Sequence, residues 1–146
     1  MKQNTLAALL LLIPACQAPK TSDRDIVTTE VREARRLIEA REGVLGVATK
    51  PAGAWIDPRT EDQFAAGHIP GAVHLPLAEA RKRYFEFREF GTLIVYGDTW
   101  GSPIASAMCK LLIELGHDDV RVLAGGLQGW REAGETVETG AKRRSP

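Results

Sequence analysis

The residues best placed to do chemistry are the six small or polar residues from Gly97 to Ser102. They follow the aliphatic and aromatic run Leu93–Tyr96, which is typical of a strand buried on both faces. Ser102 and Pro103 then suit the N-cap and first position of a helix, and apolar residues repeat at helical spacing as far as Leu115. A tight loop between a buried strand and a helix N-terminus gathers backbone N–H groups, so the sequence predicts a small pocket for an anion.

Five residues of this loop are candidates for binding an anion or another ligand. They are Asp98, Thr99, Trp100, Gly101 and Ser102. Asp98 could serve as a nucleophile, but a carboxylate in such a loop is more simply a cap or a turn former, and its charge would oppose an anionic ligand. Trp100 either offers an exposed contact surface or packs inward over the start of the helix, and the sequence leaves both open.

The rest of the chain alternates strand-like and helix-like stretches that would hold this loop in place. Thr60–Gln63 is a capping box for a short helix, and His68–Gly71 predicts a turn with type II geometry. We expect Thr28 or Thr29 to cap the first helix, while Val44–Ala54 can be an edge strand or a loop. The expected strands are residues 55–57, 73–77, 93–96 and 120–123, and the expected helices are residues 30–41, 61–66, 78–90, 103–115 and 127–133.

This alternation predicts an α/β domain with a mainly parallel central sheet and helices on both of its faces. Ligands of such sheets bind at the carboxyl ends of the strands, which is where residues 97–102 lie. We expect Trp130 to pack on the sheet and the residues after Gly134 to fray. Cys109 falls among apolar residues of an expected helix, where a free cysteine is ordinarily a buried small hydrophobe.

Composition limits the classes of function. The chain has 146 residues, 44% of them hydrophobic and 26% charged, which suits one globular domain with a core of its own. Basic and acidic residues balance at 19 each, so no basic surplus indicates a nucleic-acid partner. The two cysteines and three histidines lack the spacing of a disulfide framework or a metal site, so we expect no metal and no cofactor.

The first residues are typical of a targeting segment. A lysine precedes the apolar run Leu6–Ile13, which is too short for a membrane-spanning helix of about 20 apolar residues. The sequence Ile13–Cys16 resembles the lipobox of bacterial lipoproteins, in which the cysteine is lipidated and becomes the first residue. Residues 1–15 would then be a signal peptide, Cys16 the lipidation site, and residues 16–26 a flexible tether. A plain secretory peptide cut near Ala15 or Ala18 is the alternative.

Several motifs together resemble the rhodanese-like (sulfurtransferase) domain family. Asp57-Pro58-Arg59 matches its Asp-x-Arg, and residues 64–72 match its Phe-Ala-Ala-Gly-His-Ile-Pro-Gly-Ala. The strand end Val95-Tyr96 leads into the family's active loop. The C-terminal matches are Leu115–His117, Val120–Leu123, Gly125-Gly126 and Trp130. The resemblance implies one three-layer rhodanese-like domain over residues 27–138. From the last residues themselves we expect a disordered tail at residues 139–146.

The same resemblance implies that the usual nucleophile is missing. In catalytic members a cysteine follows the strand end, lies in the anion pocket as a thiolate and holds sulfane sulfur as a persulfide. Gly97 stands at that position, and Ser102 or Pro103 stands near the place of the arginine that often closes the loop. Cys109 lies seven residues beyond Ser102, nearly two helical turns away. The loop therefore resembles the non-catalytic type of domain, and we expect no catalytic residue.

The leading hypothesis is a catalytically inactive rhodanese-like domain, a pseudoenzyme, that binds or scaffolds a protein partner at its loop face. An N-terminal lipid would anchor it to the membrane of a bacterial envelope, facing the periplasm. Gln17 after the cysteine, where an aspartate commonly retains lipoproteins at the inner membrane, favours the outer membrane. The alternatives are a sulfurtransferase with a relocated or partner-supplied nucleophile, and a binder of small anions or sulfur species without turnover.

Overall fold

The computed structural model describes residue 22, residues 25–39 and residues 52–140. The predicted signal peptide at residues 1–15, Cys16, most of the predicted tether, residues 44–51 of the ambiguous stretch and residues 141–146 lie outside the described residues. The end of that stretch, Gly53 and Ala54, begins a strand inside the sheet and is neither an edge strand nor a loop. Within the described part, no helix combines the length and the apolar character needed to cross a membrane.

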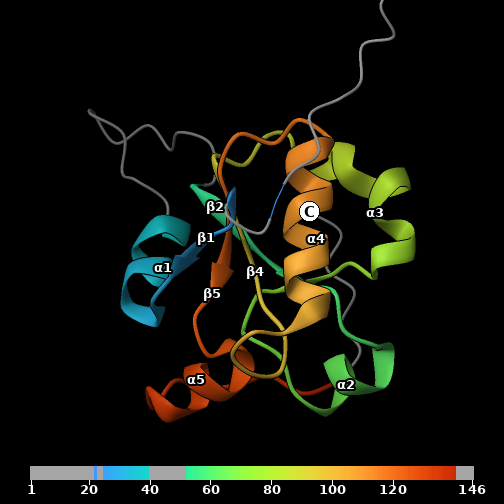
Figure 1. The fold of residues 1–146 in the computed structure, drawn as a ribbon. Coiled ribbons are helices and arrows are strands. Elements are labelled where there is room, and N and C mark those ends of the chain that lie inside the picture. The colour runs from blue at the N-terminus through green and yellow to red at the C-terminus, as the bar shows by residue number, and fades with distance from the viewer. Residues whose placement is uncertain (1–21, 23–24, 40–51, 141–146) are drawn as a thin grey trace, which may run out of the picture.

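Five parallel strands form the central sheet of the described residues (Figure 1). Their order is β1-β5-β4-β2-β3, so β4 lies in the middle of the sheet and leads into the candidate loop. Ile94 of β4 is in register with Trp55 on one side and Arg121 on the other. The strands are β1 Val27–Thr29, β2 Gly53–Asp57, β3 Val73–His74, β4 Thr92–Val95 and β5 Val120–Leu123.

Helices cover both faces of the sheet, which confirms the three-layer α/β architecture expected from the sequence. α1 and α5 lie on one face, and α3 and α4 lie on the other (Figure 1). α2 contributes to the same core as α1 and α5. The helices are α1 Val31–Ile38, α2 Glu61–Ala66, α3 Leu77–Arg83, the 3-10 helix η2 Tyr84–Phe87, α4 Pro103–Glu114 and α5 Gly126–Glu132.

Alternating side chains on the strands divide the interior into two hydrophobic cores. On β4, Leu93 belongs to the core under α3 and α4, whereas Ile94 belongs to the core under α1 and α5. The whole of β4 is therefore buried, as expected for the central strand of such a sheet. Trp130 of α5 meets Trp55 of β2 edge-on, with ring centroids 5.2 Å apart, which confirms the prediction that it packs on the sheet.

Two local sequence signals produce the expected structure. The Thr60 hydroxyl accepts a hydrogen bond from the Gln63 backbone N–H, and the Gln63 side chain accepts one from the Thr60 N–H, which confirms the capping box of α2. In the following turn, the Ala72 N–H donates to the Ile69 carbonyl at 3.0 Å. Gly71 has a φ of 77°, the positive value that a type II turn requires at this position.

The ends of two elements differ from the prediction. Thr28 and Thr29 do not cap α1, because both are extended and pair with β5; the N-cap is Glu30. The strand expected at residues 73–77 stops after two residues. Pro76 takes the N-cap position of α3, so Leu77 begins a helix and does not continue the alternation of the strand.

The helix expected at residues 78–90 is also shorter than predicted. α3 ends at Arg83, and the chain tightens into the 3-10 helix η2. This change of winding places Phe87 in the core while Phe85 remains 58% exposed. The aromatic residues that interrupt the helix are poorer helix formers than the residues before them.

The segment after Gly134 is ordered, contrary to the expectation that it frays. Glu138 exchanges two backbone hydrogen bonds of 2.9 Å with His68. The Trp130 indole N–H donates to the Thr136 carbonyl at 2.7 Å, and the Gly140 N–H donates to the Ala65 carbonyl at 2.8 Å. These bonds fasten the segment to α5 and to the end of α2. The tail predicted from residue 139 lies otherwise outside the described residues.

Candidate functional site

The candidate loop lies at the carboxyl edge of the sheet, between the end of β4 and the start of α4 (Figure 1). Its first two carbonyls, those of Gly97 and Asp98, accept hydrogen bonds of 2.8 and 2.9 Å from the Leu127 and Gln128 N–H groups at the start of α5. Gly126 has a φ of 57°, and a Cβ atom there would lie 2.5 Å from the Gly97 carbonyl oxygen. The loop is thus seated closely on α5, at a place where only glycine fits.

The space that a side chain of residue 97 would occupy is already filled. A Cβ atom built on Gly97 would overlap the Oγ and Cβ atoms of Ser102. Ser102 stands at the N-cap position of α4, but within the described residues its side chain makes no capping hydrogen bond, and it lies against Gly97. Sequence reasoning placed both residues in this loop and did not foresee that one fills the space above the other.

A buried ion network connects the loop to β2 and α2. The Arg59 side chain is 3% exposed and donates to the Asp57 carboxylate, with a shortest distance of 2.7 Å, and to the Gly67 carbonyl at 2.8 Å. Its Nη1 group donates to the Asp98 carboxylate at 2.9 Å. The guanidinium also lies over the Tyr96 ring, 5.6 Å from its centroid. The Asp-x-Arg motif noted in the sequence is therefore the anchor of the loop.

Electrostatics keep this network charged. Burial opposes the charged form of Arg59, but the hydrogen bonds and charge of Asp57 and the bond with Asp98 outweigh it, so the pKa of Arg59 is raised above its ordinary value. Burial, and then the neighbouring Asp57 charge, raise the pKa of Tyr96. The Tyr96 hydroxyl therefore stays protonated, and it accepts a hydrogen bond from the Ile69 N–H at 3.2 Å.

Asp98 has a role that the sequence analysis did not predict. One carboxylate oxygen accepts from Arg59, and the other accepts from the Gln63 side-chain amide at 2.9 Å. It was expected to cap a helix or form a turn, and the structure corrects this, because both oxygens bind side chains more than 30 positions away. The available signal was the arginine of the Asp-x-Arg motif, because a buried guanidinium has more donors than the neighbouring aspartate alone can accept from.

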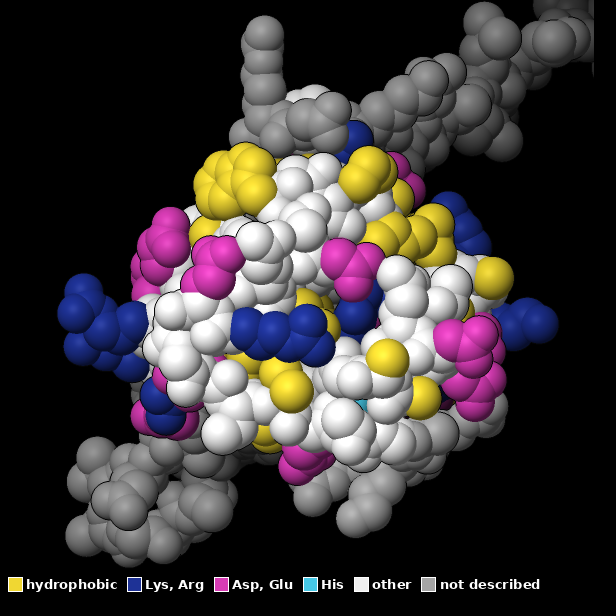
Figure 2. All heavy atoms as spheres, turned by 90° about the horizontal axis from the view of Figure 1, so that it is seen from below, with side chains coloured by type: hydrophobic (Ala, Val, Ile, Leu, Met, Phe, Trp, Pro, Cys, Tyr) yellow, Lys and Arg dark blue, Asp and Glu magenta, His cyan; other side chains and the backbone are white. Residues whose placement is uncertain are grey.

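A groove of about 450 Å³ opens beside this network, between the loop, α2 and α5. Figure 2 views the molecule from below Figure 1, the side on which α2 and α5 lie, and shows basic side chains near the centre of this face with an acidic one close by. Of the five predicted ligand-binding residues, Asp98 and Thr99 line the groove, and Trp100, Gly101 and Ser102 do not. Its lining is Arg59, Gln63, Ala66, Gly67, Asp98, Thr99, Leu127, Gln128 and Arg131.

The tip of the loop points into solvent. Trp100 is 70% exposed, so of the two orientations considered for it the outward one is present. The next residue, Gly101, has a φ of 68°, and a Cβ atom there would have no neighbour among the described residues within 4 Å. A large aromatic side chain is thus exposed one residue beyond Thr99, the last loop residue of the groove lining.

The second cysteine lies away from the loop. Cys109 is fully buried in the core under α3 and α4, as predicted, and its thiol lies 3.6 Å from the Val120 carbonyl oxygen. Burial raises the pKa of the thiol to about 12, so it is uncharged at neutral pH. A buried, protonated thiol is not a nucleophile for a ligand in the groove.

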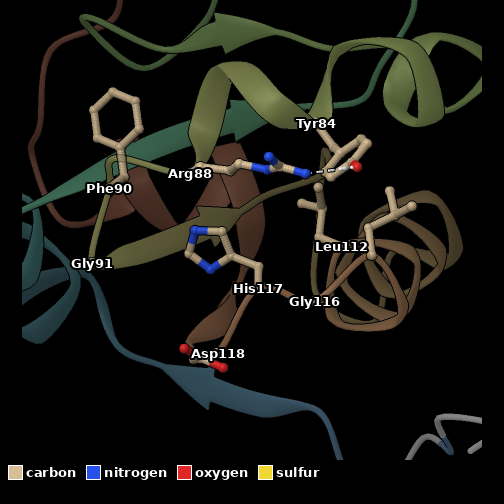
Figure 3. A pocket seen from close by; sticks show the side chains of 9 residues that line it. Tyr84, Arg88, Phe90, Gly91, Leu112, Gly116, His117 and Asp118 are labelled. Atoms are coloured by element: carbon tan, nitrogen blue, oxygen red, sulfur yellow. Dashed lines mark hydrogen bonds between the residues drawn. The ribbon is translucent and has the colours of Figure 1, made fainter.

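A second, smaller cavity of about 200 Å³ lies at the opposite end of the sheet, where β4 and β5 begin and α4 ends (Figure 3). Arg88 donates to the Tyr84 hydroxyl at 2.9 Å across one wall. The His117 Nε2–H donates to the Phe87 carbonyl at 3.3 Å, while its buried Nδ1 has no hydrogen-bond partner in the described part of the chain. The sequence analysis did not predict this cavity. It matched Leu115–His117 to the family pattern, but the other wall comes from residues 84–91, which are distant in sequence and come close only in the fold.

Comparisons with known proteins agree with this architecture. The profile of the rhodanese-like domain family matches residues 32–133. A thiosulfate sulfurtransferase structure from Pseudomonas aeruginosa is 30% identical, with a TM-score of 0.64 over 79% of this chain and 20% of that one. The structure of the Alr3790 protein from Anabaena sp. is 26% identical, with a TM-score of 0.61 over 77% of this chain and 81% of that one.

A curated relative is the HTH-type transcriptional regulator Rv0324 of Mycobacterium tuberculosis, which is 31% identical over 86 residues. The match covers 59% of this chain and 38% of the regulator, so the chain spans well under half the length of that relative. The family profile, by contrast, covers more than half of this chain, from within α1 to the end of α5. The chain therefore belongs to the rhodanese-like domain family.

Proposed function

We propose that this chain is a catalytically silent rhodanese-like domain that binds a partner protein through the face formed by the loop and the adjoining groove. The observation that carries the proposal is the filled space at Gly97, where the Ser102 side chain lies in the position that a side chain of residue 97 would need. A serine hydroxyl becomes a strong nucleophile when an adjacent base removes its proton. Within the described residues, no histidine or carboxylate is hydrogen-bonded to Ser102.

The same face has features that suit a protein contact. Trp100 is the most exposed of the large hydrophobic side chains in the described residues, at 70%. Tryptophan is enriched among the residues that contribute most to binding at protein interfaces, because it buries a large area with little loss of conformational freedom. The base of the loop is held by α5, whose first N–H groups bind the Gly97 and Asp98 carbonyls, so the contact surface is positioned before binding.

Photocrosslinking at the loop tip tests this binding role. A photoreactive amino acid in place of Trp100 should give a covalent adduct with one partner in cells that produce the chain. The matched control is the same amino acid in place of Phe85, which is 58% exposed and belongs to η2. Equal adducts from both positions, or none from position 100, would contradict a partner site at the loop face.

The alternative is sulfur transfer, and the similarity to the Pseudomonas aeruginosa thiosulfate sulfurtransferase favours it. Since Cys109 is buried and protonated, such an activity would need a relocated nucleophile elsewhere in the chain or a thiol supplied by another molecule. A third candidate, binding of small anions without turnover, would use the backbone N–H groups at the start of α4. An activity assay on the purified chain separates turnover from binding.

A further inference from the structure

Asp98 occupies a site that is built to hold a carboxylate. Its two oxygens are bound by the Arg59 guanidinium and the Gln63 amide, both at 2.9 Å. Arg59 cannot turn away, because Asp57 and the Gly67 carbonyl hold its other donors, so its Nη1 group remains directed at the groove. A buried, fixed guanidinium of this kind recognises any carboxylate presented to it in the same orientation.

We propose that Asp98 is an internal substitute for an acidic side chain of the partner, and that the groove binds an acidic peptide segment once Asp98 moves out. This inference rests on the proposed binding role of the loop face and adds the chemistry of the partner. The Asp98 side chain is 52% exposed, so water can solvate it when it leaves Arg59. The exchange replaces one carboxylate with another and leaves no charge buried without a partner.

A second cation in the groove would hold the next acidic residue of such a segment. Arg131 of α5 lines the groove and lies over Gly67, where a Cβ atom would be 2.7 Å from its Nη2 atom. Within residues 25–39 and 52–140 it has no ion pair and no side-chain hydrogen bond. In the groove, the Arg59 guanidinium is therefore covered by Asp98, whereas the Arg131 guanidinium is available to a ligand.

The position of Trp100 favours a peptide over a free anion. A small anion would need only the two guanidinium groups, whereas the exposed indole directly follows Thr99 of the groove lining and extends the contact beyond it. A peptide with acidic side chains could reach both the cations and this aromatic surface. Asp98 would compete with the peptide for Arg59. The apparent affinity for the peptide is therefore lowered in proportion to the fraction of molecules in which Asp98 has left the site.

Fluorescence anisotropy with a labelled hexaglutamate peptide tests the proposal on the full chain in detergent, with labelled hexaglutamine as the neutral control. Asp98→Asn should tighten hexaglutamate binding by about tenfold if the internal carboxylate fills the site in about nine molecules of ten. Adding Arg131→Gln to that variant should abolish most of the gain. Arg81→Gln is the matched control, since Arg81 is also exposed but lies on α3. Circular dichroism verifies that each variant is folded.

Three results would overturn the inference. One is equal affinity of the wild type and Asp98→Asn for hexaglutamate, and another is an effect of Arg131→Gln no larger than that of Arg81→Gln. The third is binding of inorganic sulfate to Asp98→Asn as tight as that of hexaglutamate, which would indicate a site for free anions. If these occur while position 100 still crosslinks to a partner, only the acidic segment is rejected; absence of the crosslink rejects the binding role itself.

Discussion

Gly97 and Ser102 together determine whether the loop has room for a nucleophilic side chain at its first position. In catalytic relatives the resemblance places a cysteine side chain at the first position, and here a hydroxymethyl group from the second position fills that volume. The two positions share one volume, so the size of the side chain at one position limits the size of the side chain that fits at the other. We therefore expect that replacing the glycine alone will not recreate a catalytic pocket.

We predict that Gly97→Ala destabilises the domain by about 1–3 kcal/mol, because the added methyl group overlaps Ser102 and forces the loop to shift. Urea denaturation measures this loss. Ser102→Gly alone removes the overlapping atoms, and the double variant Gly97→Ala/Ser102→Gly should recover most of the stability. Equal stability of Gly97→Ala and the wild type would show that the two side chains do not compete for this space.

At the scale of elements, Arg59 connects the end of β2, the end of α2 and the candidate loop. Its partners are Asp57, the Gly67 carbonyl and Asp98. Removing the guanidinium would leave the fully buried Asp57 carboxylate without its counter-ion, whereas removing the Asp98 charge would affect only a half-exposed group. The stability of the base of the loop therefore depends more on the buried pair of Arg59 with Asp57 than on the half-exposed pair of Arg59 with Asp98.

We predict that Arg59→Met costs about 3–5 kcal/mol of unfolding free energy, the range for breaking a buried ion pair on one side. Asp98→Asn should cost less than about 1 kcal/mol, as for other exposed ion pairs. Arg81→Met, at an exposed pair with Glu114, serves as the control for losing an arginine. A loss for Arg59→Met no greater than that for Arg81→Met would contradict the importance of the buried pair.

Sequence reasoning was most accurate where a local rule fixes the backbone. The capping box at Thr60, the turn at Gly71 and the helical and strand periodicities predicted elements that the structure contains. It was least accurate where a distant residue decides the outcome. The contact of Asp98 with Arg59, the overlap of Ser102 with Gly97 and the order after Gly134 all depend on tertiary neighbours.

At the scale of the whole molecule, the loop, the groove and the exposed indole lie at the carboxyl ends of the strands. The smaller cavity lies at their amino ends. The proposed membrane anchor at Cys16 would tether the domain through the residues that precede β1. A lipidated chain would hold the loop face near other proteins of the envelope and raise its effective concentration toward them.

We predict that the wild-type chain partitions with membranes and that Cys16→Ser releases it. Two acyl signals are needed for stable anchoring, and a lipidated N-terminal cysteine would supply them. Incorporation of labelled palmitate followed by fractionation measures this, and Cys109→Ser is the matched control because that thiol is buried. Labelling that persists in Cys16→Ser would contradict the anchor.

The most direct test of the central claim is a thiosulfate:cyanide sulfurtransferase assay on the wild type beside Gly97→Cys and Gly97→Cys/Ser102→Gly. We expect no turnover from the wild type and little from Gly97→Cys, because Ser102 overlaps the new side chain. The double variant should gain activity and carry a cyanide-sensitive persulfide. Turnover by the wild type that Asp98→Ala or Cys109→Ala abolishes would contradict a silent binding domain and establish an enzyme with relocated chemistry.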